Sequence, residues 1–177
     1  MRRSMAEVDP LRFTIREVRP DEFEALGELT VRAYAAIPGE TDDGYHASLR
    51  DVARRAALVP VLVAVDDDGR VLGGVSYIPG PGAPYSESER AGEAGFRTLA
   101  VDPAASGRGV GRALAEICIA RARADGREGV ALYTRPSMAI AHRLYESLGF
   151  GRDPSRDWEF EPGEWLWSYT LRFEPAG

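Results

Sequence analysis

The sequence predicts a single mixed α/β domain with about six or seven strands and four helices. Short β-branched runs with alternating polarity are typical of strands. Between them lie amphipathic segments whose apolar residues recur at helical spacing. The 177 residues contain no repeat and no linker-like stretch, and they fit one domain of ordinary size. We therefore expect one domain over residues 1–177, with a core spanning about 12–173.

The N-terminal half begins with a strand, because apolar and polar side chains alternate there. A proline followed by an aspartate then favours the start of an amphipathic helix. The run Asp66-Asp67-Asp68-Gly69 is a hairpin turn signal between two β-branched segments. In chain order, the predictions are a strand at 12–18, a helix from Pro20 to about Ile37, a helix at 44–57, and strands at 61–65 and 71–78.

The C-terminal half opens with a segment rich in proline, glycine and serine, which predicts a surface loop. Loops of this length inside a compact domain are often functional. A strand, a glycine-rich turn and a long helix follow, and the last strand alternates aromatic and polar residues. In chain order, the predictions are a loop at 79–92, a strand at 96–101, a helix from 110 to about 126, a strand at 130–134, a helix at 137–148 and a strand at 165–173.

Composition narrows the functional classes. The chain has 22 basic and 28 acidic residues, a net charge of −6, and nucleic-acid binding normally requires a basic face. No apolar run approaches the roughly 20 residues that cross a bilayer, and the start lacks the apolar stretch of a secretory signal. Cys118 is the single cysteine, which excludes an internal disulfide and a multi-cysteine metal site. We expect a cytoplasmic protein that binds no nucleic acid, no membrane and no metal.

A glycine-rich turn lies between a predicted strand and a predicted helix. Residues 106–111 are Ser-Gly-Arg-Gly-Val-Gly, and glycine lets a backbone approach a ligand closely. The first-turn N–H groups of the helix would face outward and attract an anion, as in pyrophosphate sites. A Walker loop is excluded because the chain has no lysine, and the Gly-x-Gly-x-Gly spacing differs from the dinucleotide pattern. A tight turn without a ligand remains the alternative.

A second motif ends a helix at residues 141–150, Ala-His-Arg-Leu-Tyr-Glu-Ser-Leu-Gly-Phe. Ala141, Leu144, Tyr145 and Leu148 share one helical face, and Gly149 ends the helix in the left-handed conformation. Taken alone, this pattern makes Tyr145 a core aromatic residue.

Together and in this order, the two motifs resemble the GCN5-related N-acetyltransferase (GNAT) superfamily. Its pattern has a strand ending in Val-x-Pro, a Gln/Arg-x-x-Gly-x-Gly/Ala loop, a further strand and Ala-x-x-Leu-Tyr-x-x-x-Gly-Phe. Residues 99–103, 106–111 and 141–150 match these parts. The chain departs twice: Ser106 stands where Gln or Arg opens the loop, and Met138 where Asn often precedes the alanine. The resemblance implies a central, mostly antiparallel, splayed mixed sheet flanked by helices.

The resemblance also implies a function: transfer of an acetyl group from acetyl-CoA to a primary amine of a small molecule or peptide. By this resemblance, the Leu99 N–H of this chain would polarise the acetyl carbonyl, and the main chain of Val101 would hold the pantetheine arm. The amides of residues 107–112 would bind the pyrophosphate, with Arg108 and Arg112 either adding charge or remaining solvated. The implied cofactor-binding residues are Leu99, Ala100, Val101, Gly107, Arg108, Gly109, Val110, Gly111 and Arg112. Many members dimerise, so a homodimer is compatible with the resemblance.

The proton-transfer residues follow from the same resemblance. Tyr145 matches the family's proton donor, since a phenol is protonated at neutral pH and can donate to a thiolate. Glu93 lies where the family often places a glutamate that acts as a base through water; the alternative is a solvated glutamate at a loop end. Glu40 and His46 are further candidates for the base. Cys118 is expected to be structural, and His142 to lie on the surface.

Two other functional classes are alternatives to an acetyltransferase. A non-catalytic acyl-CoA-binding regulatory module could keep the glycine loop and lack turnover; Tyr145 favours the enzyme, whereas Met138 slightly favours the module. Thiol release from acetyl-CoA with a panel of amines distinguishes the two. A small NAD-binding protein is disfavoured by the loop spacing.

Overall fold

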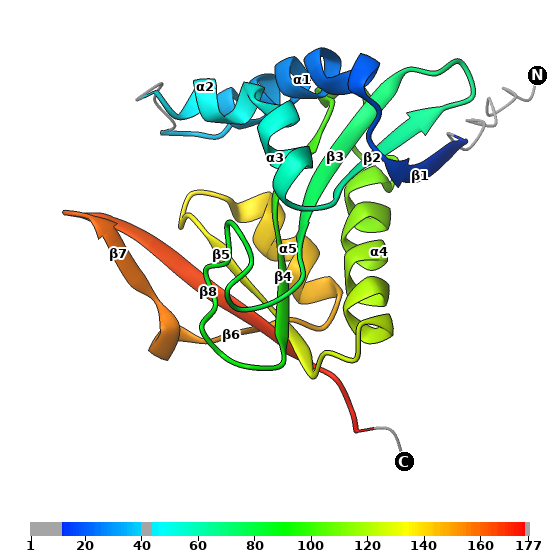
Figure 1. Cartoon of the computed structure of the whole chain (residues 1–177). Coiled ribbons are helices and arrows are strands. Elements are labelled where there is room, and N and C mark those ends of the chain that lie inside the picture. Colours follow the sequence, from blue (N-terminus) through cyan, green and yellow to red (C-terminus); the bar gives the residue numbers. More distant parts are fainter. Residues whose placement is uncertain (1–11, 40–43, 176–177) are drawn as a thin grey trace, which may run out of the picture.

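A computed structural model describes residues 12–39 and 44–175 (Figure 1). Within these ranges it contains eight strands and five α-helices. The elements are β1 (Phe13–Glu17), α1 (Phe23–Ala35), α2 (Tyr45–Arg50), α3 (Val52–Leu58), β2 (Val61–Asp66), β3 (Val71–Ile78), β4 (Glu93–Val101), α4 (Val110–Ala124), β5 (Gly129–Thr134), α5 (Ala139–Ser147), β6 (Gly151–Arg152), β7 (Trp158–Glu161) and β8 (Glu164–Arg172).

The strands form one mixed sheet in the order β1-β2-β3-β4-β5-β8-β6, and β7 pairs with β8 as a hairpin. The β4–β5 pair is parallel, and the other pairs are antiparallel. This arrangement confirms the mixed α/β fold and the mostly antiparallel sheet. In Figure 1 the β7–β8 hairpin extends beyond the rest of the sheet on the side opposite α4.

Two apolar clusters cover the two faces of the sheet. Alternate residues of β2 divide between them: Leu62 packs with the α4 and α5 cluster, whereas Val61 and Val63 pack with the α1 and α3 cluster. This division follows from the two-residue period of a strand. Because helices cover both faces of the sheet, nearly every residue of β2 and β3 is buried, and the sequences of both strands are mostly apolar.

Strand β4 carries a bulge that changes which face its side chains occupy. Arg97 pairs with Ser76 and Ala100 pairs with Gly74, so Thr98 and Leu99 lie opposite a single residue of β3. Thr98 adopts a φ of +56°, which is unusual for a β-branched residue. Phe96 therefore packs on the α4 side of the sheet, whereas Ala100 packs on the α1 side.

Strands β4 and β5 separate soon after they meet. Within the described part of the chain, their parallel register comprises only Glu93 with Gly129 and Ala94 with Val130. The remainder of β4, from Gly95 to Val101, has no ladder partner on that side. This separation confirms the splayed sheet that the resemblance implied, and it opens a space between the two strands.

Several element boundaries differ from the sequence predictions. The helix predicted at 44–57 is divided into α2 and α3 at Asp51, whose side chain accepts a hydrogen bond from the Arg54 N–H at 3.1 Å. The first helix ends at Ala35, two residues before the predicted Ile37. The sequence analysis missed β6 and β7, because both are too short to show a period.

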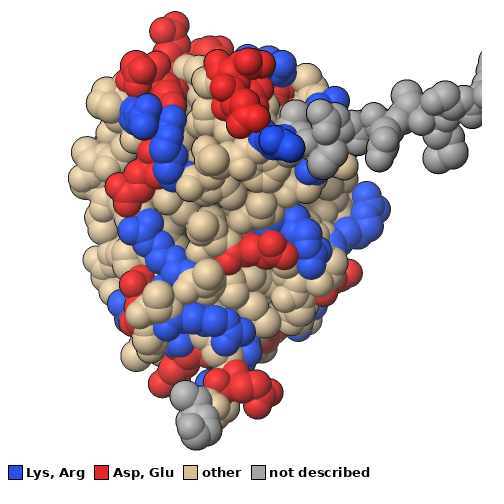
Figure 2. Space-filling view, turned by 90° about the vertical axis from the view of Figure 1, so that its right-hand side faces the viewer, with Lys and Arg blue, Asp and Glu red and all other residues tan. Residues whose placement is uncertain are grey.

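Charge is mixed on the face that carries β1 and α4. Figure 2 shows acidic and basic side chains interspersed there, with uncharged surface between them. This face therefore presents no large field of one sign. Within the described residues, no helix has the length and apolar character needed to cross a membrane.

Gly73 provides a test of the close packing of β3 against β4. A Cβ at this position would lie 2.6 Å from the backbone oxygen of Ala100 and 3.2 Å from Val110 Cγ1. We expect Gly73→Ala to lower the free energy of unfolding by about 1–3 kcal/mol, because the backbone oxygen cannot easily move away. Gly151→Ala is the control, since a Cβ there meets nothing within 4 Å. Equal urea midpoints for the two variants would contradict this packing.

Candidate functional site

The space between β4 and β5 forms a cavity of about 310 Å³. Its floor consists of β4, β5 and α5, and its outer walls come from the end of α1, the start of α2 and the β7–β8 hairpin. The cavity therefore exists because the two parallel strands separate. It is lined by segments more than 100 residues apart in the chain, from Tyr34 to Leu166.

Aromatic rings make up much of the cavity wall. They come from six elements and surround the exposed edge of β4. The rings are those of Tyr34, Tyr45, Phe96, Tyr133, Tyr145, Trp158 and Phe160. Sequence reasoning missed this wall, since Trp158 and Phe160 reach the cavity only through the undetected strand β7.

Tyr145 lies on α5, facing the sheet, and lines the cavity. Its ring is buried among Phe96, Phe150 and Tyr169, with ring centroids 5.8–6.2 Å apart. Burial raises the pKa of its phenol above the ordinary value, so the hydroxyl keeps its proton at neutral pH. Tyr145 is therefore a buried core residue and also carries a protonated hydroxyl at the cavity, so its burial in the core does not exclude a role as proton donor.

The part of β4 that has left β5 also lines this cavity. Thr98 and Leu99 form the bulge and line the cavity wall. Ala100 and Val101 continue the strand toward the glycine-rich turn, and the Asp102 N–H donates to the Leu72 carbonyl at 2.8 Å. The structure therefore brings Leu99 and Tyr145 to one cavity.

The glycine-rich turn leads from β4 into α4. Gly107 and Gly109 adopt φ values of +76° and +83°, and a Cβ on either would meet no protein atom within 4 Å. Gly109 is the N-cap of α4 and has no side chain with which to cap the first-turn N–H groups. The turn is thus an open, positively polarised helix start of the kind that accepts a phosphate group.

The neighbouring residues of this turn differ in their surroundings. Val110 is buried under the sheet, and Gly111 approaches Val101 closely, since a Cβ there would lie 3.3 Å from Val101 Cγ2. Arg108 is exposed at the turn. Arg112 pairs with Glu116 at 3.0 Å and donates to Ser147 Oγ at 3.0 Å, so part of its charge is already engaged.

Glu93 lies at the start of β4, outside the residues that line this cavity. Arg156 donates to both of its oxygens, at 3.0 Å and 2.7 Å, and Ser88 donates at 2.7 Å. Burial alone would raise the pKa of Glu93, but these hydrogen bonds lower it. The arrangement stabilises the ionised carboxylate and makes Glu93 a weak proton acceptor.

Glu87 is the carboxylate that the structure brings to the cavity, although sequence reasoning did not select it. It lines the cavity together with Leu99 and Tyr145. Burial raises the pKa of its carboxyl group, while Arg97 acts in the opposite direction. The only sequence signal was its position in the proline- and glycine-rich loop at 79–92.

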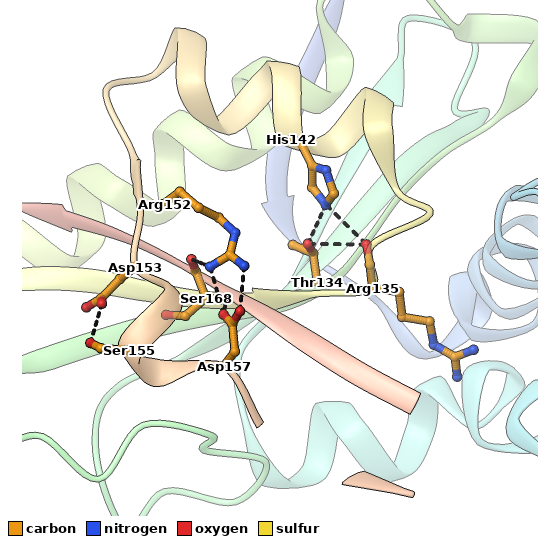
Figure 3. Close-up of polar contacts among 8 residues, drawn as sticks. All are labelled: Thr134, Arg135, His142, Arg152, Asp153, Ser155, Asp157 and Ser168. Carbon is orange, nitrogen blue, oxygen red and sulfur yellow. Dashed lines mark hydrogen bonds and ion pairs between the residues drawn. The ribbon is translucent and has the colours of Figure 1, made fainter. Parts of the chain in front are cut away.

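His142 was predicted to lie on the surface, and that prediction is wrong. Its side chain is buried and stacks on Trp167 and Tyr169, with ring centroids 5.4 Å and 5.3 Å away. Figure 3 shows its Nε2 atom beside Thr134 Oγ1 at 2.6 Å and the Arg135 carbonyl at 3.1 Å. Burial lowers the pKa of this histidine. It therefore joins α5 to the end of β5.

A second polar cluster in Figure 3 supports the hairpin. Arg152 donates to Asp157 Oδ1 at 2.7 Å and lies over the Trp167 ring at 4.6 Å. Asp157 also accepts the Ser168 N–H at 2.9 Å. These contacts fix the chain just before β7, and they explain how a short hairpin with exposed tryptophans keeps a defined position.

The other residues considered in the sequence analysis are Glu40, His46 and Cys118. Glu40 lies outside the described residues, and His46 lies on α2, partly exposed. Cys118 is buried within α4, and burial raises the pKa of its thiol to about 12, which is in keeping with a structural role. Among residues 12–39 and 44–175, no group of three His, Cys, Asp or Glu side chains could hold a metal ion.

Comparison with known proteins agrees with this geometry. Residues 20–150 match the acetyltransferase (GNAT) family, and the chain belongs to that family. Among curated proteins it is similar to mycothiol acetyltransferase of Cellulomonas flavigena, 39% identical over 88 residues. That match covers 48% of this chain and 25% of the relative. For mycothiol acetyltransferase of Sanguibacter keddieii, the identity is 30%, covering 78% of this chain and 44% of the relative. The chain thus spans less than half the length of these relatives.

Solved structures resemble the whole fold. YncA of Salmonella typhimurium, solved with its cofactor acetyl-CoA, is 25% identical, with a TM-score of 0.64 over 93% of this chain and 95% of that one. The ribosomal-protein-S18-alanine N-acetyltransferase of Escherichia coli shares the fold at 22% identity. Its TM-score is 0.66, over 94% of this chain and 97% of that one.

The Glu93–Arg156 pair predicts a pH-dependent contribution to stability. Glu93→Gln keeps the side-chain size but removes the charge, and we expect it to lower the free energy of unfolding by about 1.5–3 kcal/mol at neutral pH. The pair lowers the folded-state pKa of Glu93, so its contribution is present above the unfolded-state pKa and is lost as the pH falls through the folded-state value. The difference from wild type should therefore shrink below about pH 4. Urea denaturation at several pH values checks this, and a difference independent of pH would contradict it.

Proposed function

We propose that this chain is an acetyl-CoA-dependent N-acetyltransferase that acetylates a primary amine of a small molecule or peptide on a single domain. Family membership supports this proposal, as do relatives that are named acetyltransferases. The observation that carries it is the cavity itself. There the unpaired edge of β4 and the protonated phenol of Tyr145 lie together, directly before the open glycine turn.

The residues of the glycine turn fit acetyl-CoA. We assign the pyrophosphate to the amides of Gly107, Gly109 and Gly111 and to the first-turn N–H groups of Val110 and Arg112. The positive φ values and the open space at Gly107 and Gly109 allow a ligand to approach the main chain there. Arg108 adds positive charge at the exposed turn.

The exposed edge of β4 would hold the acyl end of the cofactor. We assign the acetyl carbonyl to the Leu99 N–H, and the pantetheine arm to the main chain of Ala100 and Val101. When bound, acetyl-CoA supplies an activated acyl group and a thiolate leaving group. A fixed N–H donor in a cavity stabilises negative charge on a carbonyl oxygen without reorganisation.

Tyr145 would act as the general acid. Its phenol keeps its proton at neutral pH because burial disfavours the phenolate, so a proton is available there for the departing thiolate. The packing of its ring against Phe96 and Phe150 fixes where the hydroxyl lies. Core packing therefore supports the chemical role.

An acetylation screen tests the function. The purified protein is mixed with acetyl-CoA and a panel of amines, and release of free thiol is followed. We expect turnover with at least one amine class. Tight binding of acetyl-CoA without turnover for any amine would instead support the non-catalytic module.

The glycine turn gives a binding prediction. Gly109→Val places a β-branched side chain at a φ of +83°, where the phosphates would lie. We expect calorimetry to show loss of acetyl-CoA binding in a folded variant. Gly163→Val is the matched control, because Gly163 has a similar φ of +82° but lies in the turn between β7 and β8. If Gly109→Val keeps full affinity, the pyrophosphate assignment is wrong.

The phenol gives a kinetic prediction. Tyr145→Phe removes one hydroxyl and keeps the ring, so we expect kcat to fall about 10²-fold with little change in acetyl-CoA affinity. Tyr77→Phe is the control. The Tyr77 hydroxyl is also partly buried, but it donates to Asp125 Oδ2 over 2.7 Å, and Tyr77 does not line the cavity. Tyr77→Phe should lower stability and leave kcat unchanged. Equal kcat for wild type and Tyr145→Phe, with chemistry rate-limiting, would leave Tyr145 as a packing residue.

A further inference from the structure

The loop at 79–92 is held so that Glu87 meets the cavity. The Ser86 N–H donates to the Ala83 carbonyl at 3.1 Å, and the Ser88 hydroxyl donates to Glu93 at 2.7 Å. Both neighbours of Glu87 are therefore fixed by hydrogen bonds. Tyr85 adopts a φ of +63°, a strained conformation that tends to persist where a loop has a specific task.

The carboxylate of Glu87 is largely enclosed but still able to accept hydrogen bonds. It forms an ion pair with Arg97, whose Nη1 lies 3.6 Å from Oε1, beyond hydrogen-bond distance. Arg97 Nη1 instead approaches the Tyr85 carbonyl at 3.4 Å, and its guanidinium lies over the Tyr85 ring at 5.7 Å. The carboxylate thus keeps lone pairs for a ligand.

Among residues 12–39 and 44–175, Glu87 is the only carboxylate that lines this cavity. Among the described residues that line it, the other ionisable groups are Arg97, Arg135 and the phenols of Tyr34, Tyr45, Tyr133 and Tyr145. Glu93, six positions further along, is already satisfied by Arg156 and Ser88. A cation entering the cavity would therefore find its negative partner at Glu87.

The aromatic rings of the cavity wall indicate which apolar group a cationic ligand could have attached to it. Tyr34 and Tyr45 meet edge to face with centroids 6.0 Å apart, and Trp158 and Phe160 meet similarly at 6.1 Å. Ring faces attract both planar apolar groups and ammonium groups. Trp158 remains 42% exposed at the rim, so a ligand could cover it.

We propose that Glu87 is the catalytic base, and that the acceptor is a cationic primary amine attached to an aromatic or other planar apolar group. This inference rests on the proposed acetyl transfer and specifies its acceptor side. Glu87 binds the ammonium group, while the rings of Tyr34, Tyr45, Trp158 and Phe160 bind the apolar body. The amine nitrogen then faces the Leu99 edge of β4 and Tyr145 in the same cavity.

The proton balance of the step is simple. One N–H bond of the ammonium group breaks, its proton moves to the Glu87 carboxylate and then to solvent, and the electron pair stays on nitrogen. That pair forms the C–N bond of the amide as the C–S bond breaks and its electrons leave on sulfur. Tyr145 protonates the sulfur, and the second proton lost from nitrogen restores the phenol. The net products are an amide, a thiol and one proton.

The main experiment compares Glu87→Gln with wild type across pH. With 2-phenylethylamine and acetyl-CoA, we expect kcat/KM to fall about 10²-fold near neutral pH. The variant must rely on free amine, so its log kcat/KM should rise by about one unit per pH unit where wild type is level. A purely structural role for Glu87 would lower the rate without changing this slope.

Matched variants separate Glu87 from its neighbours. Glu89→Gln changes an exposed glutamate of the same loop and should leave the pH profile as in wild type. Glu93→Gln should lower stability yet keep the wild-type slope. If Glu93→Gln acquires the new slope and Glu87→Gln does not, Glu93 is the base and the proposal is overturned.

Two further measurements test the acceptor class independently of turnover. Calorimetry with 2-phenylethylamine should show binding to wild type at least about tenfold tighter than that of ethylamine or 3-phenylpropanoate, and weaker binding to Glu87→Gln. Carbon NMR of the unliganded protein should show one carboxyl group with a raised pKa that disappears in this variant. Equal binding of the three probes overturns the acceptor assignment. A wild type that binds 2-phenylethylamine through Glu87 but releases no thiol with any amine overturns the acetyl transfer instead.

Discussion

The bulge in β4 is the constraint on which the rest of the molecule depends. By inserting one extra residue opposite β3, it reverses the faces of the strand between Phe96 and Ala100. The strand can then pack apolar residues against both helical layers, while its other edge leaves β5 after two residue pairs. A strand that satisfied all its hydrogen bonds on both sides would leave no room for a cavity. The early separation from β5 opens the cavity, and the bulge places Thr98 and Leu99 along its wall.

Glu87 and Glu93, near the start of β4, show how hydrogen-bond partners determine the stability of a carboxylate charge. Glu93 accepts hydrogen bonds from Arg156 and Ser88, and this stabilises its charge. Glu87 forms only an ion pair with Arg97, 3.6 Å long, among the contacts of the described residues, and burial raises its pKa more than Arg97 lowers it. The same side chain is thus a structural anchor at one position and a proton acceptor in our proposal at the other. The difference lies in surroundings built by segments that are distant in sequence.

Much of the fold could be predicted from the sequence because its signals are local. Alternation of apolar residues indicated the long strands, and the Gly107–Gly109 spacing and the Ala141–Phe150 motif each depend on one turn or one helix. The cavity wall could not be predicted in this way. Strand β7 has four residues and becomes a wall only by pairing with β8. His142 was misjudged because its burial comes from Trp167 and Tyr169, two rings on a strand that no helical pattern reveals.

The contact of Arg156 with Glu93 and Ser88 has a mechanical consequence. Arg156 lies two residues before the start of β7, whereas Ser88 adjoins Glu87 in the loop before β4. One largely buried guanidinium, with 8% of its side chain exposed, therefore ties together two walls of the cavity that the chain itself separates by 68 residues. Because Arg156 is bonded to the loop, a movement of the hairpin and the loop away from each other would have to break these contacts.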